Sequence, residues 1–530
     1  MPVSTLFRTL ALAILTLCLF AASPAHAEWR KAETEHFILY GDVSERTLRT
    51  YASKIERFDA LLRTYYPIQS DVQIPKLEIY LADGARDMRR ILPDGSQGIA
   101  GFYSADAGRI YTVTNIANPE ALSTLFHEYA HHFMFQMSAA AYPSWFVEGF
   151  AEYYSTVVME PEKIEVGRED RGRMMYFTHL GANEWAPMAD VLKWRVSRSG
   201  RARIGDYYAQ AWALTHYLMS TPERRQMLNQ YLTGVIRGGD PEAAMQAATG
   251  RTSAELQNDM RRYLLGRITY YTLQIDIPMP EVTVSTIGAD EGAFTWFDLR
   301  LDDTPLVVAS ENDPDDPRSP EVKAQMARDA ARYREELITN ALAAAARRPD
   351  NRMGMLVAAR ANRLKGDPGA GLAALQPLLA VDSTDADALR IAAALLMDQA
   401  GAEPDPATAL SRRRLAMSYL GQAMELDPLD FRIYLGLNDT RRGQPGYPNA
   451  NDIRTLEAAT ALAPQADENR LRLAEAYMAQ SLWNEAKTML TPVANAPHPG
   501  ADRVRARTLL AAIATATGQV VNDDEAVAAP

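Results

Sequence analysis

Two histidines placed one helical turn apart constrain this chain more than any other feature. The run His127-Glu128-Tyr129-Ala130-His131 has the H-E-x-x-H pattern, and residues 119–126 before it are apolar enough to bury a helix. Four helical residues advance by about 400°, so His127 and His131 are predicted to lie on one face. Both imidazoles can then reach one Zn²⁺ ion at about 2.0–2.1 Å, with Glu128 beside the metal. His132 lies about 100° further round the helix and is predicted to pack or to support the ligands rather than to bind metal itself.

A second helix is predicted to supply the remaining ligand. Residues 143–152 read PSWFVEGFAE, with Ser144 as a candidate N-cap and with Glu148 and Glu152 one turn apart. A catalytic zinc has three protein ligands and an open fourth position. We therefore expect Glu148 to be the third ligand and Glu152 to accept a hydrogen bond from a ligating histidine. The alternative is a pair of surface carboxylates, but the aromatic neighbours would half-bury them, which is costly without a cation.

His127-Glu128-x-x-His131 followed by Trp145-x-x-Glu148-Gly149-x-x-Glu152 resembles the gluzincin zinc peptidases, especially the peptidase-MA-like proteins. The resemblance implies an α+β zincin-type catalytic domain over roughly residues 30–265. It also implies one zinc ion and Glu128 as the general base. The run Tyr208-Ala209-Gln210-Ala211-Trp212 is similar to a helix of aminopeptidase-N-type members, whose tyrosine stabilises the transition state. By position Tyr208 takes that role, with Tyr207 as the fallback and a buried core tyrosine as the alternative.

The chain also departs from that family pattern. The spacing from His131 to Glu148 is a little shorter than in the aminopeptidase-N or thermolysin groups. Residues 99–103 (IAGFY) replace the Gly-x-Met-Glu-Asn strand and offer no carboxylate for a substrate's amino terminus. An endopeptidase is therefore expected, with strand 109–114 pairing with an extended substrate. His179 and His216 are further candidate polar groups near the site, although such a histidine is more often an ordinary core or surface residue.

The first residues have the pattern of a cleavable signal peptide. Arg8 precedes an apolar run at 10–22, and Ala25-His26-Ala27 provides a cleavage site just before Glu28. Residues 1–27 are therefore expected to direct the protein to the periplasm or outside the cell, and no later segment reads as a membrane span. The only cysteine, Cys18, lies in this segment. The mature chain thus has no disulfides, and any metal site must use histidines and carboxylates.

A chain of 530 residues is expected to form two or three domains. Residues 28–275 alternate strand-like and helical patterns: strands at 34–40 and 76–81, a helix at 44–65, and a hairpin of 101–103 with 109–114. Residues 276–320 are rich in Pro and Asp and are predicted to be a linker with a small β element, with short strands at 282–285 and 294–301.

Residues 321–518 are predicted to be all-α and resemble a tetratricopeptide-repeat solenoid of about four units. The unit endings fall at Pro349, Ser383, Pro428, Pro464 and His498, with an insertion-like stretch at 401–406. The alternative is a plain helical bundle. Concave faces of such solenoids commonly receive peptides, so protein partners are expected. Residues 519–530 are predicted to be a disordered tail.

These features together predict an exported zinc metallopeptidase whose repeats bind partners or substrate. The alternatives are a non-catalytic protein-binding adaptor built on the same fold, and a peptidase that acts on cell-wall peptides. The net charge of −12 argues against a nucleic-acid-binding protein, which needs an excess of Lys and Arg.

Overall fold

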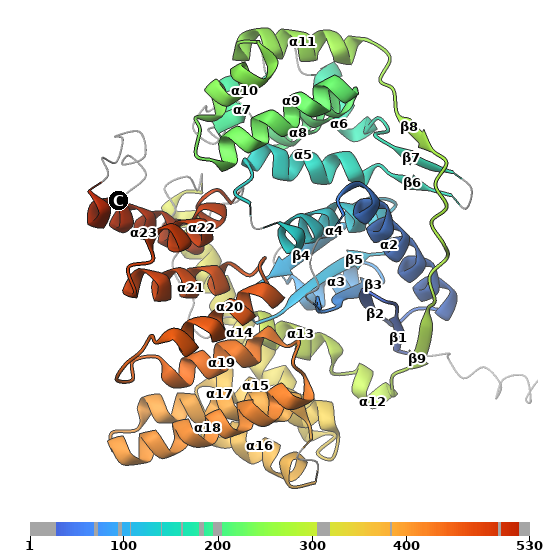
Figure 1. Cartoon of the computed structure of the whole chain (residues 1–530). Helices are drawn as coiled ribbons and strands as arrows, with labels where there is room; N and C mark the ends of the chain where they lie inside the picture. The colour runs from blue at the N-terminus through green and yellow to red at the C-terminus, as the bar shows by residue number, and fades with distance from the viewer. Residues whose placement is uncertain are drawn as a thin grey trace, which may run out of the picture.

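The computed structural model describes residues 28–67, 73–93, 98–106, 108–138, 140–160, 163–179, 185–193, 204–304, 318–381, 384–496 and 500–518. The expected signal peptide, Cys18, the predicted unit endings Ser383 and His498, and the tail 519–530 lie outside these residues. An N-terminal α+β part contains the sheets, and paired helices make up the C-terminal part (Figure 1).

The main sheet has six strands in the order β4-β5-β3-β2-β1-β9. The strands are β1 Arg30–Glu33, β2 Phe37–Gly41, β3 Leu77–Ala82, β4 Gly101–Ala105, β5 Ile110–Asn115 and β9 Thr283–Thr286. Strands β2, β3 and β5 are parallel, whereas β4, β1 and β9 run antiparallel to their neighbours. The central strand β3 (LEIYLA) is buried at every residue except the half-buried Glu78, because helices cover both of its faces.

The two sides of the sheet pack on different helices. On one side, Phe37, Leu39 and Ile79 pack into a core with α2 (Glu45–Tyr65) and α4 (Ala121–Met137). On the other, Tyr80 and Tyr111 pack on α3 (Ala85–Ile91) and α13 (Thr295–Asp303). The predicted helix at 44–65 is confirmed, and the Ser44 side chain caps it by accepting from the Thr47 amide.

Two strand predictions need correction. The segment 34–40 is not one strand: the chain turns at residues 34–36, where the Thr34 hydroxyl accepts from the Phe37 amide, and β1 and β2 flank the turn. The hairpin of β4 and β5 is confirmed, but the expectation that strand 109–114 pairs with a substrate is wrong. Strand β5 is hydrogen-bonded on both sides, to β4 and to β3, so its backbone groups are already used. The free edge at this end of the sheet belongs to β4.

The stretch predicted as a linker is confirmed in one place and wrong in another. Residues 283–286 form β9, which confirms the short strand expected at 282–285 and adds it to the main sheet beside β1, and a short helix α12 (Ala289–Gly292) follows. The strand expected at 294–301 is the helix α13 instead. Trp296 and Leu299, three residues apart, pack on the sheet, while Phe294 and Leu301 pack on repeat helices. This spacing is helical and not the two-residue alternation of a strand.

A helical layer and a small sheet complete the N-terminal part. The helices are α5 Ser144–Ser155, α6 Arg171–His179, α7 Met188–Lys193, α8 Ile204–Met219, α9 Pro222–Ile236, α10 Pro241–Thr249 and α11 Ser253–Leu265. The small sheet joins β6 Val158–Met159, β7 Ile164–Val166 and β8 Tyr271–Leu273. None of the helices that the structure describes is long and apolar enough to cross a membrane.

The C-terminal part is a series of paired helices, as predicted. Its helices are α14 Pro320–Ala346, α15 Arg352–Lys365, α16 Pro368–Val381, α17 Ala386–Ala402, α18 Pro406–Leu426, α19 Phe431–Arg441, α20 Ala450–Leu462, α21 Asp467–Ala479, α22 Trp483–Ala494 and α23 Ala501–Thr517. Each helix packs on the next, which favours a solenoid over a bundle with one shared core. Four pairs run from α15 to α22, and Pro428 and Pro464 lie directly after the second and third pairs.

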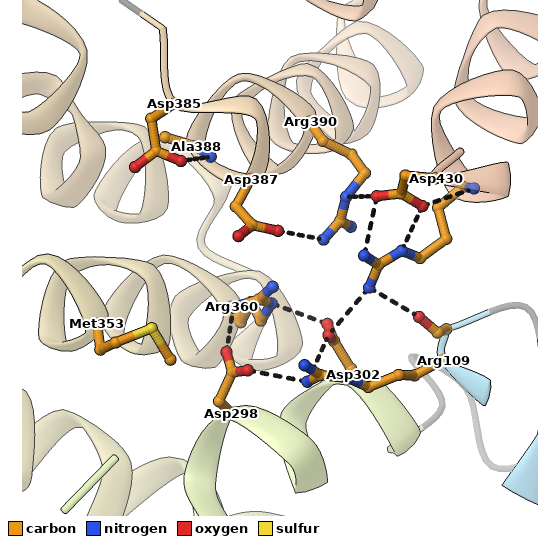
Figure 2. A network of polar contacts seen from close by, with 12 residues as sticks. Arg109, Asp298, Asp302, Met353, Arg360, Asp385, Asp387, Ala388, Arg390 and Asp430 are labelled. Atoms are coloured by element: carbon orange, nitrogen blue, oxygen red, sulfur yellow. Dashed lines mark hydrogen bonds and ion pairs between the residues drawn. The ribbon is translucent and has the colours of Figure 1, made fainter. Parts of the chain in front are cut away.

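A buried network of charges fastens the repeats to the sheet (Figure 2). The Arg109 guanidinium at the start of β5 donates to Asp298 of α13 at 2.9 Å. Arg360 of α15 also pairs with Asp298, and its Nε lies 2.8 Å from Asp302. Arg432 of α19 donates to the Gly108 carbonyl at 3.2 Å. Arg360 and Arg432 belong to the repeats, whereas Arg109 and Gly108 belong to the N-terminal part. These charged hydrogen bonds therefore join the two parts directly.

Candidate metal site and substrate cavity

Helices α4 and α5 bring three metal-binding side chains together. The Nε2 atoms of His127 and His131 lie 3.1 Å apart. The Oε2 atom of Glu148 lies 3.8 Å from Nε2 of His127 and 3.5 Å from Nε2 of His131. Ligands about 2.05 Å from a tetrahedral ion are about 3.3 Å from one another. The three donors, two imidazole nitrogens and one carboxylate oxygen, therefore fit the preferences of Zn²⁺.

The position of Glu148 depends on the glycine that follows it. All twelve residues of α5 are buried, and Glu148 is only 1% exposed. A Cβ atom at Gly149 would lie 2.5 Å from the Ala211 carbonyl oxygen of α8, so only glycine lets the two helices approach this closely. The close contact with α8 holds α5 against α4, which keeps the Glu148 carboxylate beside the imidazoles.

The surroundings of His127 and His131 shift the pKa values of the two imidazoles in opposite directions. Burial lowers the pKa of His127 to about 4, helped by the neighbouring His131. Burial also opposes a charge on His131, but the Glu148 carboxylate outweighs it and raises the pKa of that imidazole. A neutral imidazole is the form that binds a metal ion, so His127 is already in its ligating form at neutral pH.

Glu152 lies behind His127, where the sequence predicted it. Its Oε1 atom is 3.5 Å from Nδ1 of His127, the ring nitrogen that faces away from Glu148. Arg173 of α6 holds this carboxylate with both arms of its guanidinium, through Nε to Oε2 at 2.8 Å and through Nη2 to Oε1. Burial raises the pKa of Glu152 in spite of Arg173. Sequence reasoning missed Arg173, because nothing in its local pattern indicates a contact 21 residues away.

A cavity of about 330 Å³ opens onto the three ligands and is also lined by Glu128 and Tyr208. Glu128 points about 100° round α4 from His127 and still lines this cavity, so it borders the same space as the candidate ligands. Burial and the Glu148 carboxylate raise the pKa of Tyr208, which keeps its hydroxyl protonated. The Arg173 guanidinium lies 5.4 Å from the centre of the Tyr208 ring. Tyr207, the fallback, is fully buried and does not line this cavity.

The other candidate histidines lie elsewhere. His132 is buried, stacks on Tyr129 and lies 3.1 Å from the Tyr103 hydroxyl, so it packs as predicted. His216 is a core histidine whose ring nitrogens are 2.7 Å from the Tyr263 hydroxyl and 2.7 Å from the Gly167 carbonyl oxygen. His179 ends α6, and its side chain lies outside the part of the chain that the structure describes.

The C-terminal repeats form one wall of the cavity, which the sequence did not predict. The wall consists of the α20–α21 turn, the first residues of α21 and the end of α22: Pro464, Gln465, Asp467, Arg470, Pro492 and Ala496. Direct contacts hold it in place. The Gln465 amide nitrogen lies 3.5 Å from Nδ1 of His132, and the Ser144 hydroxyl donates to the Asn495 carbonyl at 2.7 Å. Residues of the repeats therefore line part of the cavity. The other repeat helices extend away from the N-terminal part (Figure 1).

Comparisons with known proteins cover only parts of the chain. A family model described as "Protein of unknown function (DUF1570)" matches residues 121–236, the stretch from α4 to α9 that carries the three candidate ligands and Tyr208. No curated protein matches the chain. Among solved structures, the chain is similar to TTC0263, a thermophilic TPR protein of Thermus thermophilus, with 19% identity over 36% of this chain and 94% of that one and a TM-score of 0.31. It is also similar to MamA, with 16% identity over 34% and 95% of the two chains and a TM-score of 0.24.

Proposed function

We propose that the protein is a zinc-dependent peptidase of the gluzincin type, exported to the periplasm or beyond. One observation carries the proposal: His127, His131 and Glu148 converge within metal-ligand distances in a cavity that also holds Glu128. When bound, Zn²⁺ would supply a Lewis acid that polarises a carbonyl and makes water a nucleophile at neutral pH. The expected signal peptide supports export, and the repeats are proposed to hold protein partners or substrate.

The remaining chemistry falls to side chains of the cavity. Glu128 is placed to take a proton from the attacking water and later to give it to the leaving amine. The protonated Tyr208 hydroxyl is a donor for the oxygen that becomes negative in the transition state. Glu152, held by Arg173, fixes the orientation of His127 through its Nδ1 atom. The cavity is small and walled by the repeats, which favours peptides and extended segments over folded proteins.

The test uses the chain from residue 28 to 530, the expected mature form, and its Glu128→Gln variant. Metal analysis should find one zinc ion per chain in both proteins. Only the unmodified protein should cleave a proteome-derived peptide library, because loss of a general base costs about 10²–10⁴-fold in rate. Glu120→Gln, at the exposed start of the same helix, is the matched control and should cleave normally.

Three results separate this proposal from its alternatives. Equal cleavage by the Glu128→Gln variant would contradict the mechanism. A zinc-loaded protein that binds other proteins but cleaves neither the library nor cell-wall peptides would favour the adaptor. Cleavage of purified wall peptides in preference to the library would identify a wall peptidase with the same chemistry.

A further inference from the structure

One arginine outside the cavity contacts two side chains of the candidate site. The Arg173 guanidinium donates to both carboxylate oxygens of Glu152, through Nε to Oε2 at 2.8 Å and through Nη2 to Oε1. Its central carbon also lies over the Tyr208 ring, 5.4 Å from the ring centre, and cation–π contacts extend to about 6 Å. Glu152 in turn lies 3.5 Å from Nδ1 of His127. The same guanidinium is therefore linked to a candidate metal ligand and to the proposed oxyanion donor.

Local contacts hold the backbone that carries this guanidinium. At the start of α6, the Asp170 side chain accepts a hydrogen bond from the Arg173 amide at 2.8 Å. Helix α6 packs on α8, the helix that carries the tyrosine. Tyr176 of α6 lies against Gly205 of α8, where an added Cβ atom would be 2.6 Å from the Tyr176 hydroxyl oxygen. Because the guanidinium is a planar fork, binding Glu152 with two arms also fixes its orientation.

The orientation of the Tyr208 side chain rests on contacts of its ring. Tyr208 is half-buried at the cavity, and its hydroxyl forms no hydrogen bond with any residue that the structure describes. The Tyr207 ring meets it edge-on, with the ring centres 6.3 Å apart. The Arg173 guanidinium contacts the face of the ring and leaves the hydroxyl free to donate. A displacement of about 1 Å can cost about 100-fold in rate, so a held ring matters for the proposed step.

We propose that Arg173 is a positioning residue that holds the Tyr208 ring in the orientation from which its hydroxyl donates to the oxyanion. This inference rests on the proposed function, since it assigns a further residue to the same site. Arg173 does not line the cavity, so it acts through its two partners and not on the substrate. One guanidinium thereby couples the support of His127 to the donor in the transition state.

The orientation of the ring can be measured without zinc and without turnover. The expected mature chain is prepared metal-free with fluorotyrosine, and the fluorine NMR resonance of Tyr208 is identified by its absence in Tyr208→Phe. Arg173→Met should broaden or split this resonance, because the ring loses the cation over its face and takes more than one orientation. Arg173→Lys keeps a cation there and should keep the resonance narrower than Arg173→Met does. Glu152→Ala removes the anchor of the guanidinium, so it should also broaden the resonance, and it decides the question if Arg173→Met does not fold.

Arg168→Met is the matched control. Arg168 also pairs with a glutamate, Glu165 at 2.9 Å, and its guanidinium also lies over a tyrosine ring, 5.7 Å from the centre of Tyr270. None of these three residues lines the cavity. Arg168→Met therefore removes the same two kinds of contact elsewhere and should leave the Tyr208 resonance narrow.

Cleavage kinetics at saturating zinc give a second readout. Arg173→Met should lower kcat about 10- to 100-fold and leave KM nearly unchanged, because the contact it supports is made only in the transition state. Tyr208→Phe should cost less in the Arg173→Met background than in the parent, since the two residues act as a unit. Arg173→Lys should recover part of kcat. An arginine with a merely structural role would give independent, additive losses.

Three results would overturn the inference. They are a single narrow Tyr208 resonance in both Arg173→Met and Glu152→Ala, equal broadening in Arg168→Met, and additive losses of kcat for Arg173→Met and Tyr208→Phe. Failure of the proposed function appears separately, as the absence of cleavage by the unmodified chain. In that case the resonance of the metal-free protein still decides whether Arg173 holds the ring.

Discussion

The Ser144 hydroxyl donates a hydrogen bond to the Asn495 carbonyl oxygen across 351 residues of sequence, at 2.7 Å. Ser144 was expected to cap α5, but it is the first residue of the helix, and Pro143 occupies the cap position without a side-chain bond. The hydroxyl instead joins the helix that carries Glu148 to the end of α22. The metal site and its wall are thus directly connected.

Loss of the hydrogen bond between Ser144 and Asn495 should lower the stability of the folded protein. Ser144→Ala is expected to lower the free energy of unfolding by about 1 kcal/mol, the usual value of one buried hydrogen bond. Urea unfolding is the measurement. In the control Ser123→Ala, which removes a local bond within α4, the change should be within about 0.5 kcal/mol. Equal effects of both substitutions would contradict the assigned role.

Removal of Glu148 should affect the metal before it affects the fold. Glu148→Gln replaces the carboxylate ligand with a neutral amide, and zinc affinity should fall at least about 100-fold, more than for loss of a supporting group. A chelator competition assay measures this affinity. The exposed Glu160→Gln serves as the control. A chelator should also lower the melting temperature of the unmodified protein, because bound metal stabilises the folded state. Unchanged zinc affinity would exclude Glu148 as a ligand.

Glu152 should increase the zinc affinity of the site without binding the metal itself. Glu152→Ala removes the acceptor 3.5 Å from Nδ1 of His127, and zinc affinity is expected to fall about 10- to 100-fold. Arg173→Lys keeps a cation beside Glu152 and should retain most of the affinity. The same competition assay applies. Affinity within twofold of the parent after Glu152→Ala would show that the contact has no role in metal binding.

The charge network of Figure 2 should contribute strongly to stability. Arg360→Met leaves Asp298 and Asp302 buried with fewer cations, which is expected to cost about 3–5 kcal/mol in urea unfolding. The more exposed pair of Arg348 with Asp290 provides the comparison, and Arg348→Met should cost no more than about 1 kcal/mol. Similar losses for both variants would argue against a special role for the buried network.

Asp467 should make the protein sensitive to pH. Burial, with the nearby Asp502, raises the pKa of Asp467 from 3.8 to about 7. Between these values the unfolded chain has lost a proton that the folded protein keeps, so stability falls as pH rises through this window. Asp467→Asn should remove that fall, making the variant progressively more stable than its parent, by a few kcal/mol at most. Unfolding midpoints measured across the window test this, and parallel profiles would contradict it.

The features that could be predicted from sequence are those encoded over a few residues. The spacing of His127 and His131 fixes their common face, and aromatic neighbours mark Glu148 as buried. Helix endings such as Pro428 and Pro464 likewise mark the repeat units. Each of these signals needs only local geometry, which is why the structure has them in the expected places.

The features that were not predicted from the sequence depend on contacts between segments that are far apart in the chain. Arg173 reaches Glu152 from another helix, and Arg470 reaches the cavity from α21 in the repeats. A short strand was expected at the position of β9, but its place beside β1 in the main sheet was not. Its four residues TVST are mostly exposed, so no hydrophobic face indicates which strand they join. The backbone hydrogen bonds to β1 fix that place.

The residues that line the cavity are synthesised at different times, because its wall comes from the C-terminal repeats. Synthesis proceeds from the N-terminus, so α4 and α5 leave the ribosome long before α21 and α22. An unfinished chain therefore carries the imidazole pair without the residues that restrict what can approach it. In the proposed peptidase, selectivity would therefore arise last, and a product cut short before residue 464 would lack this wall of the cavity.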